Sequence, residues 1–189
     1  MIRPENLSLV NPEVDYYVLK EKWWDWGGGD VYDKKGTTMG HMYRRIISLR
    51  AFTEVTNNDG SLLFSVERKL ISMRPSYMIK DCQENVLGRT NRKILTLFRP
   101  QLWLEDEKGT KSLEAQGNFL GKKFEIKDSA NRLIAQVGKS DFVRDLILGG
   151  SFFDFADTYA VKILDKEYDK RLILGFVIAI DNSVHDKKR

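Results

Sequence analysis

The chain has 189 residues, of which 42% are hydrophobic and 11% aromatic. This apolar content is sufficient for one continuous core and excludes intrinsic disorder except at the ends. The net charge is +4 and the pI is near 9.0, a balance that permits an anionic partner but is also ordinary for a domain of this size. Cys82 is the only cysteine, which excludes an intramolecular disulfide and fits a reducing compartment.

Three tryptophans beside three glycines are the first unusual feature along the chain. Trp23, Trp24 and Trp26 precede Gly27 to Gly29, which we expect to form a flexible turn. Packing beside a strand explains the indoles best, while a membrane interface and a ligand pocket stay open as alternatives.

A strand–turn–strand pattern then repeats along the chain. The β-prone runs at 52–56 and 61–66 flank an Asp-Gly turn, in which both residues tolerate positive φ. The unit 77–88 resembles the unit 124–135, because in each an aromatic residue and an isoleucine alternate onto one face before an aspartate starts the turn. Chance similarity between two short hairpins explains the likeness equally well. The pattern predicts an antiparallel meander, and we expect one domain over residues 1–189.

The C-terminal part departs from this pattern twice. Residues 141–148 predict a short helix that ends at Gly149. Residues 172–180 are apolar on every side and must be enclosed by protein, either as a central strand or as a helix that fills a closed barrel. As a helix, this segment would be capped by Asp169 and continued from Asp181 to His185.

No segment is long enough to span a membrane as a helix. The run 172–180 is far shorter than the ~20 apolar residues required, and residues 1–22 contain no signal-peptide core. We therefore expect a cytoplasmic protein, and peripheral membrane contact stays open.

Motifs that carry a family resemblance are spread over nearly the whole chain. They are Tyr17–Lys22, Val31–Asp33 with Gly36 and Gly40, Glu67–Met73 with Tyr77, Gly117–Phe119, Phe124–Asp128, Asp157–Val161 and Leu172–Asp181. In this order they resemble the LURP-one-related family, of the same superfamily as the phospholipid scramblases and the tubby C-terminal domain. The resemblance implies a mainly β fold, a closed antiparallel barrel of roughly 12 strands around a buried C-terminal helix whose core residues would be Leu172, Phe176 and Ile180.

The same resemblance implies no established enzymatic activity. Members of the superfamily bind phosphoinositides, move phospholipids between leaflets or have no known biochemical role. This chain lacks the proline-rich N-terminal region and the cysteine-rich palmitoylation stretch of the scramblases, so it is more similar to the soluble branch.

Basic residues are the candidates for ligand binding. They could hold phospholipid phosphates by charge-assisted hydrogen bonds, but a basic face needs residues from several strands because neighbours on one strand face opposite sides. Scattered charge on a solvated exterior is the alternative. The candidate residues are Arg44, Arg68, Lys69, Arg92, Lys93, Lys122 and Lys123.

Other site chemistry has little support in the sequence. Two histidines and one cysteine cannot assemble an ordinary zinc site, and no nucleophile elbow or phosphate loop is present, so we expect no enzyme and no cofactor. A weak calcium alternative rests on Asp157, Asp165 and Asp169, which lack the spacing of a calcium loop.

Three functions are compatible with these features to different degrees. We expect a monomeric, non-enzymatic binding domain that engages phosphoinositide or other acidic phospholipid headgroups or a protein partner. The alternative is a calcium-regulated, scramblase-like protein, in which residues 172–180 would leave the barrel and enter the bilayer. Nucleic-acid binding is disfavoured because the basic and aromatic residues do not interleave in a recognition pattern.

Overall fold

The computed structural model describes residues 8–22, 28–47, 50–69, 76–94, 100–119, 123–139 and 158–185. These ranges contain twelve strands and one helix. They are β1 (Tyr16–Lys22), β2 (Gly28–Tyr32), β3 (Thr38–Ile47), β4 (Arg50–Asn57), β5 (Leu62–Arg68), β6 (Tyr77–Asp81), β7 (Val86–Ile94), β8 (Pro100–Glu105), β9 (Lys111–Asn118), β10 (Lys123–Asp128), β11 (Leu133–Lys139), β12 (Thr158–Ile163) and α2 (Lys170–His185).

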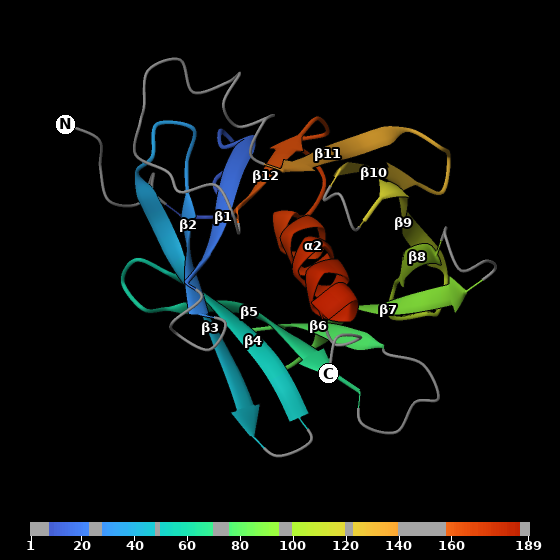
Figure 1. Cartoon of the computed structure of the whole chain (residues 1–189), viewed down its shortest axis with the longest axis horizontal. Coiled ribbons are helices and arrows are strands. Elements are labelled where there is room, and N and C mark those ends of the chain that lie inside the picture. Colours follow the sequence, from blue (N-terminus) through green and yellow to red (C-terminus); the bar gives the residue numbers. More distant parts are fainter. Residues whose placement is uncertain are drawn as a thin grey trace.

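The strands form one closed antiparallel barrel around the helix (Figure 1). Each strand pairs with its neighbours in sequence, and β1 pairs with β12 to close the wall, with Val18 opposite Ala160. Closure leaves no free strand edge among the described residues, and it provides an interior in which an apolar helix can be enclosed. The predicted mainly β barrel around a C-terminal helix is confirmed.

Five of the hairpins share one turn, in which the residue three positions after the starting Asp or Asn has a positive φ. The backbone N–H of that residue donates to the carbonyl of the first, as in a three-residue loop that ends in a left-handed residue. A β-bulge then shifts the register of each hairpin further along the strands. The positive-φ residues are Gly36, Gly60, Glu84, Gly109 and Asn131. The similarity predicted between the units 77–88 and 124–135 is therefore real, since they are two of these five hairpins.

Aspartates make these turns rigid. In the four turns that begin with Asp33, Asp81, Asp106 and Asp128, the carboxylate accepts hydrogen bonds of 2.8–2.9 Å from the N–H groups two and four residues further on. An Asp side chain that imitates the backbone in this way favours a tight turn over a longer loop.

All five turns lie at the same end of the barrel, which we call the turn end. They join β2 to β3, β4 to β5, β6 to β7, β8 to β9 and β10 to β11. The odd-numbered strands therefore run from the turn end to the opposite end. Helix α2 runs the same way, because it follows β12, which ends at the turn end.

Helix α2 begins where the sequence predicted and lies in the core. Asp169 caps it, since its Oδ1 accepts a hydrogen bond of 2.9 Å from the backbone N–H of Arg171. Phe176 is 0% and Ile180 2% exposed, whereas Leu172 is only partly buried. The helix prediction for 172–180 is confirmed and the strand alternative is wrong.

Gly175 lets the helix approach the wall closely. A Cβ at this position would lie 2.9 Å from Cγ2 of Ile79 on β6, closer than side chains normally pack. The helix makes its closest approach to β5, β6 and β7, and Gly175 faces that side of the barrel.

One prediction near the N-terminus is wrong, and two lie outside the described residues. Gly28 and Gly29 do not form a flexible turn but begin β2, where they are buried and pair with Lys22 and Glu21 of β1. Ladder hydrogen bonds to strands on both sides outweigh the low β-propensity of glycine. The tryptophans at 23–26 and the helix predicted at 141–148 lie outside the described residues.

Candidate anion-binding site

The structure brings the predicted basic residues together at one end of the barrel. Six of the seven lie in the second halves of β3, β5 and β7, immediately after β5, or at the first position of β10. These positions are all in the half of the barrel away from the turns. These six are Arg44, Arg68, Lys69, Arg92, Lys93 and Lys123. Lys122 lies outside the described residues. We call this end of the barrel the basic end.

Strand register and exposure divide five of these six residues into two groups, and the side chain of Lys93 lies outside the described part of the structure. Arg44 lies opposite Thr53, which in turn lies opposite the core residue Val66, so Arg44 is on the inner wall. By contrast, Lys69 and Lys123 are exposed at the rim.

The same reasoning places two further arginines on the inner wall. Arg68 lies opposite Tyr77 and Arg92 lies opposite Leu102, and both of these partners belong to the hydrophobic core. Of the predicted basic residues, three are therefore inward arginines and two are exposed lysines at the rim.

Arg92 has the most unusual surroundings of the three arginines. It is 8% exposed, and burial lowers the pKa of its guanidinium, which still remains charged at neutral pH. Within the described residues its Nε has no hydrogen-bond acceptor, and no carboxylate raises its pKa. A buried N–H without an acceptor costs free energy, so the Nε group of Arg92 does not itself stabilise the fold.

Arg44 lies beside the last part of helix α2. With Asp181, Asn182 and Ile178 of the helix, it lines a cavity of about 20 Å³, which has room for about one water molecule. The helix C-terminus carries partial negative charge, so an arginine here also stabilises the helix end. Arg44 therefore has a structural role at the helix end.

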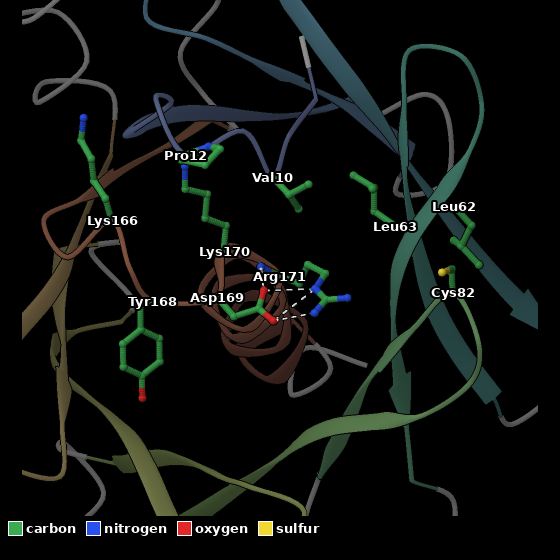
Figure 2. Close-up of a pocket in the computed structure, with 10 residues that line it drawn as sticks. All are labelled: Val10, Pro12, Leu62, Leu63, Cys82, Lys166, Tyr168, Asp169, Lys170 and Arg171. Atoms are coloured by element: carbon green, nitrogen blue, oxygen red, sulfur yellow. Dashed lines mark hydrogen bonds and ion pairs between the residues drawn. The ribbon is translucent and has the colours of Figure 1, made fainter. Parts of the chain in front are cut away.

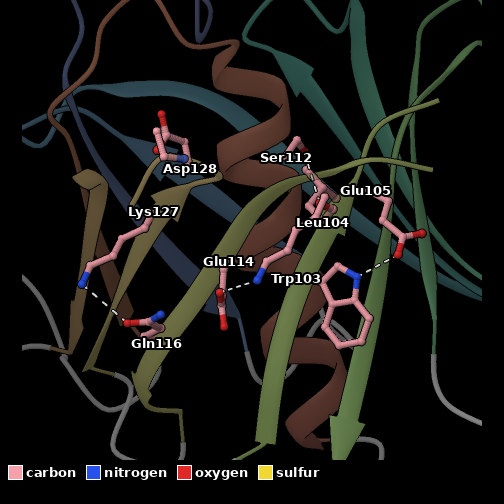
Figure 3. Close-up of polar contacts among 10 residues, drawn as sticks. Trp103, Leu104, Glu105, Ser112, Glu114, Gln116, Lys127 and Asp128 are labelled. Atoms are coloured by element: carbon pink, nitrogen blue, oxygen red, sulfur yellow. Dashed lines mark hydrogen bonds and ion pairs between the residues drawn. The ribbon is translucent and has the colours of Figure 1, made fainter. Parts of the chain in front are cut away.

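The outer wall of the barrel shows a different pattern, with charges that pair locally. On β8, β9 and β10, the indole N–H of Trp103 donates to Glu105 at 2.8 Å, Lys111 forms an ion pair with Glu114, and Lys127 donates to Gln116 at 3.5 Å (Figure 3). Such exposed pairs contribute little energy, and they offer no concentrated positive charge to a ligand.

The turn end has a larger cavity but weaker ligand chemistry. A cleft of about 340 Å³ lies between the start of α2, the start of β5 and the turn before β7. Its cations are already engaged. Arg171 forms an ion pair with Asp169, with 2.7 Å between Nη2 and Oδ2 (Figure 2). The Lys170 amine donates to the carbonyls of Asn11 and Val14, and the Lys166 amine lies 3.8 Å from Oδ2 of Asp15.

The predicted calcium residues serve the backbone in this region. Asp165 accepts a hydrogen bond from the N–H of Glu167, and Asp169 caps the helix. Asp157 lies outside the described residues. In the part of the chain that the structure describes, no group of three His, Cys, Asp or Glu side chains could hold a metal ion.

The described residues also contain no helix that is both long and apolar enough to cross a bilayer. Helix α2, the one helix among the described residues, has sixteen residues.

Comparisons with known proteins agree with the fold and identify the family. A crystal structure of a protein from Arabidopsis thaliana superimposes with a TM-score of 0.63 at 11% sequence identity, covering 94% of this chain and 98% of that one. A search of the curated proteins finds no match. The model of the LURP-one-related family, which is not a known enzyme family, matches residues 14–181. Since this match covers most of the chain, the protein belongs to the LURP-one-related family.

Proposed function

We propose that this protein is a non-catalytic binding domain whose ligand is an acidic phospholipid headgroup, taken up at the basic end of the barrel. The observation that supports this most directly is the convergence of basic residues from β3, β5, β7 and β10 at that end. Each strand contributes only one or two cations, and closure of the barrel brings them to one rim.

Charge at the rim suits a membrane surface. Anionic leaflets attract basic segments with about 1 kcal/mol per Lys or Arg close to the surface, and the attraction decays within a Debye length. The exposed rim lysines Lys69 and Lys123 can make this contact without any rearrangement of the barrel.

The scramblase-like alternative has no comparable support. It requires residues 172–180 to leave the barrel, yet Ile173, Phe176 and Val177 are at most 1% exposed and lie in the main core cluster. Removing them would expose the apolar interior of the barrel along with the helix.

Vesicle flotation tests the proposal. Phosphatidylcholine vesicles with and without phosphatidylinositol bisphosphate are compared at low and high salt. The variant pair Lys69→Glu and Lys123→Glu is matched with Lys34→Glu and Lys108→Glu, which change the same charge at exposed positions of the turn end.

We expect the protein to float with the acidic vesicles at low salt, and the rim pair to lose this binding while the turn-end pair keeps it. Equal recovery of the natural protein with and without acidic lipid would contradict the proposal. Equal loss in both pairs would also contradict it, because net charge alone would then explain the binding.

A further inference from the structure

We infer that the inner-wall arginines Arg44, Arg68 and Arg92 form a recessed site in the mouth of the barrel that binds the phosphate groups of the ligand, while the rim lysines only attract it. This inference rests on the proposed function and specifies where and how the headgroup binds. The three arginines repeat in the sequence at intervals of 24 residues. Each lies eleven positions after the residue that starts the preceding turn, which is Asp33, Asn57 or Asp81.

Register brings the three arginines to the same height in the barrel. Arg44 on β3 pairs with Thr53 on β4, and Thr53 pairs with Val66 on β5. Arg68 lies two residues further along β5 than Val66. The same offset separates Arg68 from Arg92. Arg68 pairs with Tyr77 on β6, whose backbone N–H donates to Thr90 Oγ1 on β7 at 2.9 Å. Arg92 lies two residues further along β7 than Thr90.

Strands in a closed barrel are tilted relative to the barrel axis, so residues at the same height are displaced along successive strands. A displacement of two residues for every two strands compensates for this tilt. Two strand spacings and two residues along the strand place neighbouring arginine Cα atoms about 12 Å apart. Long side chains that point inward from such positions can contact the same ligand, and an anion with more than one phosphate can engage all three.

Ligand binding explains the burial of Arg92 better than a contribution to the stability of the fold does. Its Nε is buried and has no acceptor among the described residues, so the cost of desolvating this N–H has already been met before a ligand arrives. A phosphate oxygen would supply the missing acceptor, and the fork of a guanidinium binds phosphate through two parallel hydrogen bonds.

The interior also limits how deep an anion can enter. The C-terminal end of α2 carries partial negative charge, and Asp181 lines the cavity beside Arg44. Both repel an anion that moves deeper along the helix, so the phosphate groups stay at the mouth of the barrel, within reach of the three arginines.

A substitution at Arg92 separates this inference from a purely structural role. Arg92→Met keeps a long side chain and removes a buried charge that has no carboxylate partner, so thermal stability should stay equal or increase. Affinity should decrease by at least about tenfold, as expected when a charge-assisted contact to a ligand is lost. Arg132→Met, at an exposed arginine of the turn end that pairs with Asp128, is the matched control and should bind as the natural protein does.

Two probes distinguish the sources of the phosphate. Soluble inositol trisphosphate, titrated by calorimetry, presents the phosphates alone, and vesicles with phosphatidylinositol bisphosphate present them on a membrane. We expect both to bind the natural protein and both to bind Arg92→Met at least about tenfold more weakly.

Several outcomes would overturn the inference. If Arg92→Met binds both probes normally while the rim lysine pair still loses the vesicles, the recessed site is wrong and the proposed function stands. Binding to vesicles without binding to inositol trisphosphate would lead to the same conclusion. If neither probe binds the natural protein, both proposals fail. Should Arg92→Met not fold, Arg92→Lys replaces it, and undiminished binding by that variant would equally contradict a site built on the guanidinium fork.

Discussion

Replacing Phe176 with alanine should destabilise the protein strongly, because this side chain is at the centre of the enclosed helix. Phe176 is 0% exposed and lies in the main core cluster. Truncating a fully buried phenylalanine costs about 3–5 kcal/mol, the sum of lost transfer free energy and the cavity left behind. For a domain of this size, that loss corresponds to a decrease in Tm of roughly 6–20 °C.

Guanidinium unfolding followed by far-ultraviolet circular dichroism measures this cost. The midpoint should move to lower denaturant concentration while the slope stays the same, since the same surface is exposed on unfolding. Leu164→Ala is the control, because Leu164 is 43% exposed and its truncation should change stability by less than about 0.5 kcal/mol. If Phe176→Ala costs no more than this control, the helix is not the core of the barrel.

Three further predictions concern the helix and the tyrosines. Gly175→Ala should destabilise the protein because the new Cβ meets the side chain of Ile79. In a double-mutant cycle, the destabilisation should be smaller when Ile79→Ala is also present, and an absence of coupling would contradict the close approach. Asp169→Ala should lower stability by about 0.5–2 kcal/mol through loss of the cap, as measured by urea unfolding, and millimolar calcium should raise the Tm of neither form. Burial raises the pKa of Tyr16 to about 12, so folding favours its neutral form: the resulting stability is complete below pH 10 and is lost as the pH rises toward 12. Tyr16→Phe should therefore make the alkaline loss of stability shallower, and an unchanged profile would show that Tyr16 does not contribute to it.

The parts of the fold that follow from local chemistry could be predicted from the sequence. The hairpins at Asp81 and Asp128 could be predicted because the alternation of apolar residues and the Asp that starts each turn are local features. The helix from Lys170 was indicated by an apolar run with Asp169 before it, and periodicity left only the choice between helix and strand. The closed barrel decides that choice, because it offers an enclosed interior.

The orientation of the arginines could not be predicted, because it depends on long-range pairing. A β-bulge follows each of the five turns and changes which face a later residue occupies, so alternation counted from the turn is not reliable. The direction of Arg92 is fixed only by its partner Leu102 on β8. A signal was nevertheless present in the interval of 24 residues that separates Arg44, Arg68 and Arg92.

The position of Gly28 and Gly29 in a buried strand had no such signal. Three consecutive glycines are typical of a flexible turn, and only pairing with β1 and β3 holds two of them extended. The burial of Lys170, whose amine donates to carbonyls of the N-terminal segment, likewise depends on a contact between opposite ends of the chain.

Nuclear magnetic resonance of the arginine Nε–H groups tests the location of the ligand most directly. During titration with inositol trisphosphate, the Nε–H signals of Arg44, Arg68 and Arg92 should shift together with one affinity, because these groups lie at the mouth of the barrel. Arg132 and Arg171, at the turn end, should not shift. Shifts confined to Arg132 and Arg171, or a silent Arg92 in the presence of bound ligand, would contradict a phosphate site at the basic end.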